Sequence, residues 1–398
     1  MEIIAQKRVG SRALAHIRSL AEPRFPGSTG EEKAQAYIRK MFQRCGYTVN
    51  EQEFSSSLFP SEYAPRLVIG IVCSLIVVAY SFIDSFPALS IEIIVMVLLL
   101  MIFSTQWSSL IEKLYSLKRF GVLHSKNLIA MHPHRNNHIN VVFTAHYDSK
   151  SQTLSGMTRF SLFTALMVFT VLNCFGMAFA IFYTLPKPWL LVLISLQCAI
   201  GMLLQFNTTS NKSPGAYDNA SGVAVLLELA QTFSQTNPNV NLAFVATGAE
   251  EAGLCGAVAL MHDGRFLESF PPSQTIIINF DGIGCEGAVR ITNRFGLPPR
   301  HTGLLVSTTL KAIGDRFGIA VKNNWIPTGA AMDHIPFAAH GYQTVTVSTA
   351  GFHKAFRSMH TAHDVAENLS LTSIEHCYAI AQEFVDSIPA TNHLFSTN

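Results

Sequence analysis

The sequence is poor in charged residues. Asp, Glu, Lys and Arg make up 14% of its 398 residues, whereas apolar residues make up 49%. Soluble domains typically contain roughly a quarter charged residues. The net charge is only +2 and the basic residues form no stripe, which argues against a nucleic-acid-binding surface. No glycine-rich phosphate loop or dinucleotide-binding motif is present, so the sequence does not indicate a nucleotide cofactor.

The seven cysteines include no Cys-x-x-Cys pair and no zinc-finger spacing. We therefore expect free thiols rather than a disulfide framework. The first 20 residues lack an apolar core of signal-peptide length. Membrane insertion, if it occurs, is expected to depend on internal segments.

Apolar residues are concentrated in two blocks, 66–106 and 160–206. Each block contains two runs of about 17–25 residues, the length needed to cross a hydrocarbon core of about 30 Å. The runs are apolar on every face and are paired through short turns, which favours membrane spans over buried core helices. We predict four transmembrane helices in two hairpins, over Leu67–Ile83, Ala88–Gln106, Phe160–Thr184 and Trp189–Phe206.

The remaining segments, 1–65, 107–159 and 207–398, are predicted to form one discontinuous domain, because each hairpin returns the chain to its starting side. Their pattern is α/β. Strands are expected at Tyr47–Phe54, Asn127–Met131, Ile139–Ala145, Asn241–Thr247, Thr275–Phe280 and Gln343–Ser348. Helices are expected at about 8–21, 31–45, 221–235, 299–317 and 371–388.

Five short segments at strand ends or in nearby loops carry residue types that bind divalent metals. They are VVFTAHYDS with His146 and Asp148, SPGAYDNASGVA with Asp218, FVATGAEEAGLCG with Glu250 and Glu251, IIINFDGIG with Asp281, and SMHTAHDVAENL with His360.

Each segment has an ordinary structural explanation when taken alone. Asp218 could cap a helix, Asp281 could cap a turn, and the Glu250–Glu251 pair could be a solvated surface step. Together, however, they gather where open α/β sheets assemble their sites, at the carboxyl ends of strands. Two imidazoles and three carboxylates suit zinc, although cobalt or manganese could use the same ligands.

These segments, in this order, resemble the co-catalytic dizinc exopeptidases, family twenty-eight of the metallopeptidases. The family includes leucyl-type aminopeptidases, glutamate carboxypeptidases, glutaminyl cyclases and the non-enzymatic transferrin-receptor ectodomain. The resemblance covers about 1–60, 120–150 and 212–390. PGAYDNASGVA and the Glu-Glu step are its most specific parts, and DHIPF at 333–337 supports it. It implies a three-layer α/β/α sandwich with a mixed, mostly parallel sheet, here accompanied by the four membrane helices.

The resemblance also implies roles for the residues. Asp218 would bridge two zinc ions; His146 and Asp281 would complete one site, and Glu251 and His360 the other. Glu250 would be the general base, because a carboxylate that ligates a metal is too weakly basic for that task. Asp148 would accept the second N–H of the His146 imidazole. His363 is the alternative to His360, and the family pattern favours His360.

Two features depart from the soluble relatives. A whole hairpin with its flanks, 150–212, fills the gap between the His-x-Asp and PGAxDN segments. Some aminopeptidases of the family have a tyrosine near the last histidine, whereas this chain has Met359 immediately before His360. Stabilisation of the oxyanion is therefore expected from the metals or from another donor.

The insertion predicts an active-site mouth close to the bilayer, with the second hairpin forming part of its wall; the alternative is that the hairpins only anchor the enzyme. Basic residues favour a cytoplasmic domain, because only Lys187 lies in the short opposite turns. Those on the domain side are Arg66, Lys113, Lys118, Arg119, Lys150, Arg159 and Lys212. Glycosylation sequons, including the one at Asn207, argue for the opposite side.

We expect a membrane-bound zinc aminopeptidase that acts on peptides, including apolar or membrane-associated ones. Glutaminyl cyclase is the nearest alternative, since AHYDSK and DHIPF also resemble that branch, and carboxypeptidase action is a further one. A non-catalytic membrane receptor or scaffold is the alternative of a different class. The presence of all five ligands and Glu250 argues against it. Residue preference and oligomeric state do not follow from the sequence.

Overall fold

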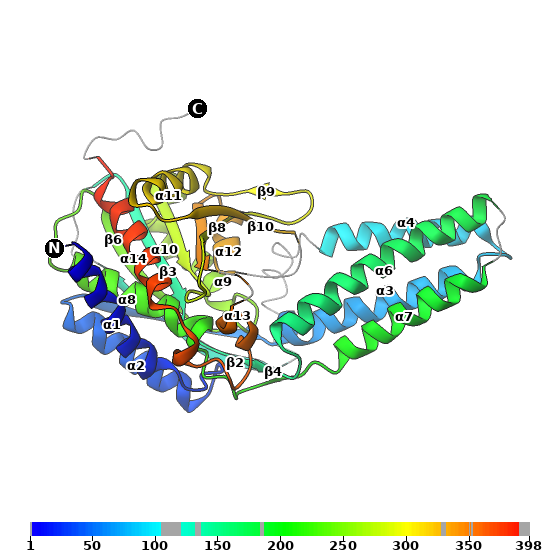
Figure 1. Ribbon diagram of the computed structural model, residues 1–398, viewed down its shortest axis with the longest axis horizontal. Helices are drawn as coiled ribbons and strands as arrows, with labels where there is room; N and C mark the ends of the chain where they lie inside the picture. The colour runs from blue at the N-terminus through cyan, green and yellow to red at the C-terminus, as the bar shows by residue number, and fades with distance from the viewer. Residues whose placement is uncertain are drawn as a thin grey trace.

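The computed structural model describes residues 2–104, 121–131, 137–183, 187–327, 332–349, 351 and 353–389. An α/β body contains the first and last described helices, α1 and α14, and a bundle of long helices projects from one side of it (Figure 1). The bundle is built from two hairpins that interrupt the sequence of the body.

A mixed sheet forms the centre of the body, with strand order β1-β2-β6-β3-β7-β11-β8-β10. Pairing is parallel in the central β6-β3-β7-β11 segment and between β8 and β10, and antiparallel elsewhere. The sheet is mixed, as expected, but antiparallel strand pairs form a larger share of it than a mostly parallel sheet would have. The strands are β1 Thr48–Ser57, β2 Val122–Met131, β3 Asn140–His146, β6 Asn241–Thr247, β7 Thr275–Phe280, β8 Val289–Phe295, β9 Arg300–His301, β10 Val321–Ile326 and β11 Gln343–Thr349; β4 Ser151–Gln152 pairs separately with β5 Thr209–Ser210.

Helices cover both faces of this sheet. Val141 and Phe143 of β3 pack into the larger core, on the face with α1, α2, α8, α11 and α14, whereas Val142 packs into a second core with α9, α10 and α12. This alternation follows from the two-residue period of a strand. The body helices are α1 Glu2–Leu20, α2 Thr29–Arg44, α8 Ser221–Phe233, α9 Cys255–Met261, α10 Gly264–Ser269, α11 Leu304–Phe317, α12 His334–Ala339, α13 Lys354–Ser358 and α14 Leu371–Asp386.

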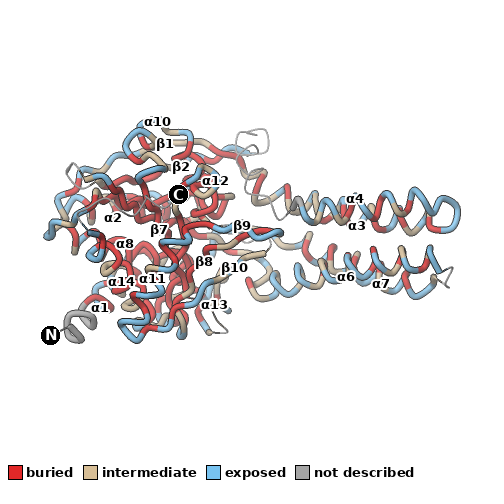
Figure 2. The backbone as a smooth tube through the Cα atoms, turned by 90° about the horizontal axis from the view of Figure 1, so that it is seen from above, coloured by how far each residue is buried: buried red, intermediate tan, exposed pale blue. Residues whose placement is uncertain are grey.

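Four apolar helices form the bundle: α3 Ala64–Ser81, α4 Pro87–Ser104, α6 Gly156–Phe182 and α7 Pro188–Gln205. Their inner faces share an apolar core. Many of the outward-facing residues are exposed (Figure 2). Three segments are long and apolar enough to cross a membrane, Phe59–Ser81, Gly156–Phe182 and Pro188–Gln205; α4 is apolar as well, but its qualifying stretch, Pro87–Ile102, is shorter. Exposed apolar surface of this extent is typical of contact with lipid or a partner.

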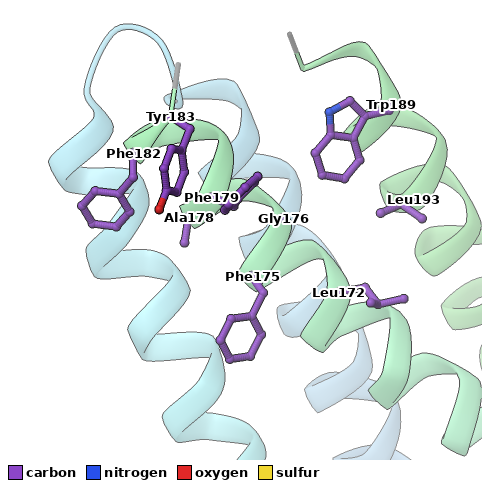
Figure 3. A pocket seen from close by; sticks show the side chains of 9 residues that line it. All are labelled: Leu172, Phe175, Gly176, Ala178, Phe179, Phe182, Tyr183, Trp189 and Leu193. Atoms are coloured by element: carbon purple, nitrogen blue, oxygen red, sulfur yellow. The ribbon is translucent and has the colours of Figure 1, made fainter. Parts of the chain in front are cut away.

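A shallow apolar groove of about 790 Å³ runs along α6 and α7 near the tip of the second hairpin (Figure 3). Gly176 is one of its lining residues, and a Cβ there would come within 2.8 Å of the Trp189 ring, so glycine permits the close packing of α6 against Trp189. Deeper in the bundle, Asn173 donates a hydrogen bond to Gln197 at 2.7 Å, which links α6 to α7. The groove is remote from the polar residues singled out in the sequence.

The structure contains all six predicted strands and all five predicted body helices, with shifted ends. The helix expected at 299–317 begins only at Leu304, because Arg300–His301 pairs with β8 as a strand. The helix expected from Phe160 begins earlier, at Gly156, because the Ser155 side chain accepts a hydrogen bond from the Thr158 amide and caps it. This earlier start places Arg159 in the first turn of α6.

Arg24 holds together the two ends of the second insertion. It is fully buried, and its guanidinium donates hydrogen bonds to the carbonyls of Tyr147, before the insertion, and of Pro214 and Gly215, after it. The backbone amide of Arg24 also donates to Ser149 Oγ. Burial lowers the pKa of Arg24 to about 10, so the guanidinium stays charged at neutral pH.

We expect Arg24→Met to lower the free energy of unfolding by about 3 kcal/mol or more, because several buried carbonyls would lose their donor together. Thermal or denaturant unfolding of the purified chain in detergent measures this. Arg18→Met is the matched control: Arg18 is 63% exposed and 4.0 Å from Glu367, so its loss should cost no more than about 1 kcal/mol. Equal effects of the two substitutions would contradict the proposal that Arg24 holds the two ends of the insertion together.

The side chain of Glu31 contacts Tyr147, the residue that directly follows β3. Its carboxylate accepts hydrogen bonds from Ser125 Oγ, from the Tyr147 hydroxyl at 3.3 Å and from the Gly27 amide at 2.6 Å. Burial raises the pKa of Glu31 to about 7, although the hydrogen bonds from Ser125 and Gly27 oppose the shift. The folded protein therefore favours the protonated form of this side chain.

This shift predicts a pH dependence of stability. The folded-state pKa lies above the ordinary 4.5, so the stabilising contribution of Glu31 is complete below that pH and is lost as the pH rises to about 7. Glu31→Gln carries no titrating group. Relative to the parent chain, it should gain about 2 kcal/mol of unfolding free energy between pH 5 and pH 8. A difference that stays constant over this range in denaturant titrations would refute the prediction.

Candidate metal centre

Strand ends and adjoining loops carry the residues singled out in the sequence. His146 ends β3, while Glu250 and Glu251 follow β6, and Asp281 directly follows β7. These three strands are parallel neighbours in the sheet, so their carboxyl ends meet at one edge. Asp218 lies in the turn Ala216–Ala220 before α8.

Asp218 lies between the two histidines. Its Oδ1 is 3.1 Å from His146 Nε2, and its Oδ2 is 2.8 Å from His360 Nε2. Asp281 Oδ1 lies 3.7 Å from His146 Nε2, and Glu251 Oε1 lies 3.1 Å from His360 Nε2. The Asp218 carboxylate thus faces both imidazoles. Asp281 lies beside His146, and Glu251 lies beside His360.

Two groups of candidate ligands result, and Asp218 belongs to both. The first adds His146 and Asp281, and the second adds Glu251 and His360; all are buried, and within each group the ligand atoms lie within 4.8 Å of one another. The Nε2 atoms of both histidines and Glu251 Oε1 have no hydrogen-bond partner among the described residues. Buried polar atoms are rarely left in this state. Nitrogen and carboxylate donors converging in this way fit zinc.

Glu250 lies beside the first group without belonging to either. Its Oε2 is 3.9 Å from His146 Nε2. Burial raises the pKa of Glu250 well above its usual range; the charge of His146 opposes the shift, and the neighbouring carboxylates add to it. A carboxylate with a raised pKa at this place is suited to accept and return a proton at neutral pH.

Asp148 and Asp364 hold the backbone on either side of the site. Asp148 accepts hydrogen bonds from the amides of Glu250, at 3.1 Å, and Glu251, at 3.0 Å. Its Oδ1 lies 3.5 Å from His146 Nδ1, which has no hydrogen-bond partner among the described residues. The hydrogen bonds of Asp148 are therefore made with the Glu250–Glu251 backbone and not, as the resemblance had implied, with the imidazole. Asp364 accepts from the amides of Tyr217, at 2.7 Å, and Asp218, at 3.3 Å.

The base of the second hairpin contacts the second ligand group. Lys150 Nζ lies 2.8 Å from Glu251 Oε2. Arg159, in the first turn of α6, and Gln152 both contact His360 Nδ1, Gln152 through Oε1 at 3.1 Å. The backbone N–H of Gln152 also donates a hydrogen bond to the backbone carbonyl of His360 at 2.9 Å. The hairpin base therefore forms part of the wall of the site.

The alternative histidine, His363, is exposed and lies outside both ligand groups. Met359 packs against the start of α6, where a Cβ on Gly156 would come within 2.8 Å of its methyl carbon.

Sequence reasoning assigned no role to several residues that contact the site, and Asp333 is one of them. This side chain of the DHIPF segment is fully buried and accepts a hydrogen bond from Thr247 Oγ1 at 2.5 Å. Burial raises its pKa to about 7. Arg159 and Gln152 gave no signal because they belong to the insertion, whereas Asp364 was visible only as a neighbour of His360.

Comparison with known proteins agrees with this site. The sequence profile of Peptidase family M28 matches residues 199–385, a range that contains Asp218, Glu250, Glu251, Asp281 and His360. A probable zinc metalloprotease of Pyrenophora tritici-repentis is 28% identical over 162 residues, which cover 33% of this chain and 37% of that protein. The matched segment is thus well under half of that relative.

Solved structures show the same fold. An aminopeptidase from Aneurinibacillus sp. strain AM-1 aligns with a TM-score of 0.55 and 17% identity, covering 96% of this chain and 94% of that one. A glutaminyl cyclase of Porphyromonas gingivalis aligns with a TM-score of 0.56 and 12% identity, covering 95% and 97%. The profile match covers just under half of this chain, and together with the zinc metalloprotease relative it makes the chain similar to peptidase family M28; the solved structures share the fold.

Proposed function

We propose that this chain is a membrane-bound, zinc-dependent exopeptidase, and specifically an aminopeptidase that removes N-terminal residues from peptides. The observation that carries the proposal is the position of Asp218, whose two oxygens face His146 and His360 separately. A bridging carboxylate of this kind suits a pair of cations a few ångströms apart.

In this proposal, Asp218, His146 and Asp281 would hold one zinc ion, and Asp218, Glu251 and His360 would hold the other. The zinc ions supply positive charge that acidifies water and polarises the scissile carbonyl. Burial alone would raise the pKa of Glu251, but the charges of His360 and Lys150 outweigh it and lower the pKa to about 2. Glu251 is therefore ionised at neutral pH, as a ligand must be.

Glu250 performs the proton transfers. Its carboxylate accepts a proton from the attacking water and then donates it to the departing amino group. Asp148 fixes the backbone of Glu250 through the amide hydrogen bond, so the carboxylate stays beside the ligand group rather than in it. Arg159 and Lys150 are the cationic side chains nearest the second group, and neither is required for this transfer.

We further propose that α3, α4, α6 and α7 all cross the membrane, with the α/β body on the cytoplasmic side. The exposed apolar faces of the bundle support this. Lys187 pairs with Asp84 at the tips of the two hairpins, away from the body. Of the basic residues that favour a cytoplasmic body, Lys113, Lys118 and Arg119 lie outside the described residues. A site wall built from the base of α6 suits apolar or membrane-associated peptides.

Glutaminyl cyclase is the second candidate, and Asp333 favours keeping it. This residue belongs to the segment that resembles that branch, and its buried carboxyl adds to the charge that raises the pKa of Glu250. A second carboxyl group that can be protonated beside a base is compatible with acid–base chemistry other than hydrolysis.

Product analysis distinguishes the two. The purified, zinc-loaded chain is incubated with peptides of varied N-terminal residue, including glutamine, and the products are identified by mass spectrometry. The aminopeptidase proposal predicts free N-terminal amino acids and shortened peptides. Loss of ammonia from N-terminal glutamine with the peptide otherwise intact would establish the cyclase instead, and release of C-terminal residues would establish a carboxypeptidase.

A further inference from the structure

The two candidate ion positions differ in the charge of their surroundings. Behind the position of His146 and Asp281 lie carboxylates: Asp148 Oδ1 is 3.5 Å from His146 Nδ1, and Glu250 Oε2 is 3.9 Å from His146 Nε2. Behind the other position lie cations, Lys150 on Glu251 and Arg159 on His360. Both cations come from the base of the second hairpin.

Arg159 also affects the tautomer of His360. A guanidinium has only donors, so a hydrogen bond from Arg159 to His360 Nδ1 requires a lone pair on Nδ1. The proton of the neutral ring then resides on Nε2, the atom that faces Asp218 and Glu251. An Nε2–H cannot ligate a metal ion, because ligation uses the lone pair of that nitrogen.

Gln152 offers the opposite arrangement. Its Oε1, 3.1 Å from His360 Nδ1, accepts a proton on that nitrogen and leaves the Nε2 lone pair free for a metal. Zinc binding at this position therefore requires His360 to give up its hydrogen bond from Arg159 and donate one to Gln152. At the first position no cation competes in this way. The group beside His146 Nδ1 is the carboxylate of Asp148, which can only accept a proton from that nitrogen.

Lys150 adds an electrostatic cost at the same position. Its ammonium lies 2.8 Å from Glu251 Oε2, so part of the charge of that ligand is already neutralised. The Lys150 side chain is 15% exposed and Arg159 is partly buried, and in such surroundings charges repel an incoming divalent cation with reduced screening by salt.

We infer that the two zinc positions are unequal, and that Lys150 and Arg159 make the Asp218–Glu251–His360 position the weaker and more readily exchanged one. Both residues act through the ligands, so they are positioning residues. Because Arg159 belongs to the first turn of α6, occupancy of this position is linked to how the second hairpin sits against the body. The inference rests on the proposed two-metal site and goes beyond it.

Zinc binding measured by competition with a calibrated chelator tests this on the full-length chain in detergent. The parent chain should show two affinities that differ by about tenfold or more. Arg159→Met should strengthen the weaker affinity by about tenfold and leave the stronger one unchanged. Lys150→Met should act in the same direction. Tighter binding is a result that simple structural damage would not produce.

Two further variants assign the effect. Arg159→Lys keeps a cationic donor, so the weaker affinity should stay near that of the parent. Arg66→Met, at the root of the first hairpin, is the matched control, since Arg66 contacts Glu62 and the Asn207 carbonyl rather than the site. It should change neither affinity. His360→Ala should abolish the weaker affinity only.

The outcomes separate this inference from the proposed function. Two equal affinities, unchanged or weakened in Arg159→Met, would overturn the inference and leave the two-metal peptidase intact. Loss of the stronger affinity in His360→Ala would overturn it as well. A parent chain that binds fewer than two zinc ions at saturation would overturn both. Cobalt absorption spectra in place of zinc give the same readout without any assay of turnover.

Discussion

Glu250→Gln should lower kcat for peptide hydrolysis by about 10²–10⁴-fold, the usual contribution of a general acid–base residue. Glutamine has the size of glutamate but cannot accept and return the proton. Glu250 belongs to neither ligand group, so the zinc content should not change. Steady-state kinetics and metal analysis of the same preparation measure both quantities.

The surface carboxylate Glu383 provides a control for this substitution. Glu383 lies on α14 and pairs with Arg316 of α11. It belongs to neither ligand group, so Glu383→Gln should retain the parent kcat. A Glu250→Gln chain that keeps both its zinc and its activity would show that another group transfers the proton. An inactive parent chain that nonetheless binds zinc would instead favour the receptor or scaffold alternative.

Asp218→Ala should remove both zinc ions and all measurable peptidase activity. Asp218 contributes one oxygen to each ligand group, so its loss should weaken both positions together. The effect should exceed the roughly 10–100-fold loss of metal affinity that follows removal of a supporting residue. Metal analysis after dialysis measures the retained zinc.

Substitution of Asp281 offers the comparison for Asp218. Asp281 belongs only to the group of His146, so Asp281→Ala should weaken one position and spare the other. Asp263→Ala, which removes the cap of the short helix α10 and an ion pair with Arg265, should keep both ions. If Asp218→Ala retained one ion at full affinity, the carboxylate would not bridge, and the two-metal arrangement would have to be revised.

The body of the fold was predictable because its central strands are continuous apolar runs. β3, β6 and β7 are buried on both faces, and such strands stand out from amphipathic helices in the sequence. The same runs predict where polar residues will gather, since parallel strands end at one edge. His146 and Asp281 lie at two such strand ends, and His146 Nε2 is 3.7 Å from Asp281 Oδ1; their pairing at one metal was implied by the family resemblance.

Strands β8 and β10 were not predicted. β8, VRITNRF, contains Arg290 and Arg294, and β10, VKNNWI, contains adjacent asparagines. β10 lies at the sheet edge, where several of its side chains are exposed, so it lacks the apolar run that marks a buried strand. These two strands are recognised only from their pairing in the structure, β10 with β8 and β8 with β11.

The contacts between the hairpin and the site also could not be predicted. Arg159 and His360 are 201 residues apart in sequence, and no motif joins them. What brings them together is the helix start at Gly156 and the pairing of β4 with β5, which positions the base of the insertion. Sequence spacing alone indicated that the hairpin is near the ligands, but not which ligand it contacts.

Anomalous X-ray diffraction at the zinc absorption edge, from crystals of the full-length chain grown with zinc, tests the account most directly. We expect two anomalous peaks a few ångströms apart, one between His146 and Asp281 and the other between Glu251 and His360, with Asp218 between them. Zinc-replete crystals with a single peak, or with peaks away from these side chains, would contradict the two-metal centre and the peptidase mechanism built on it.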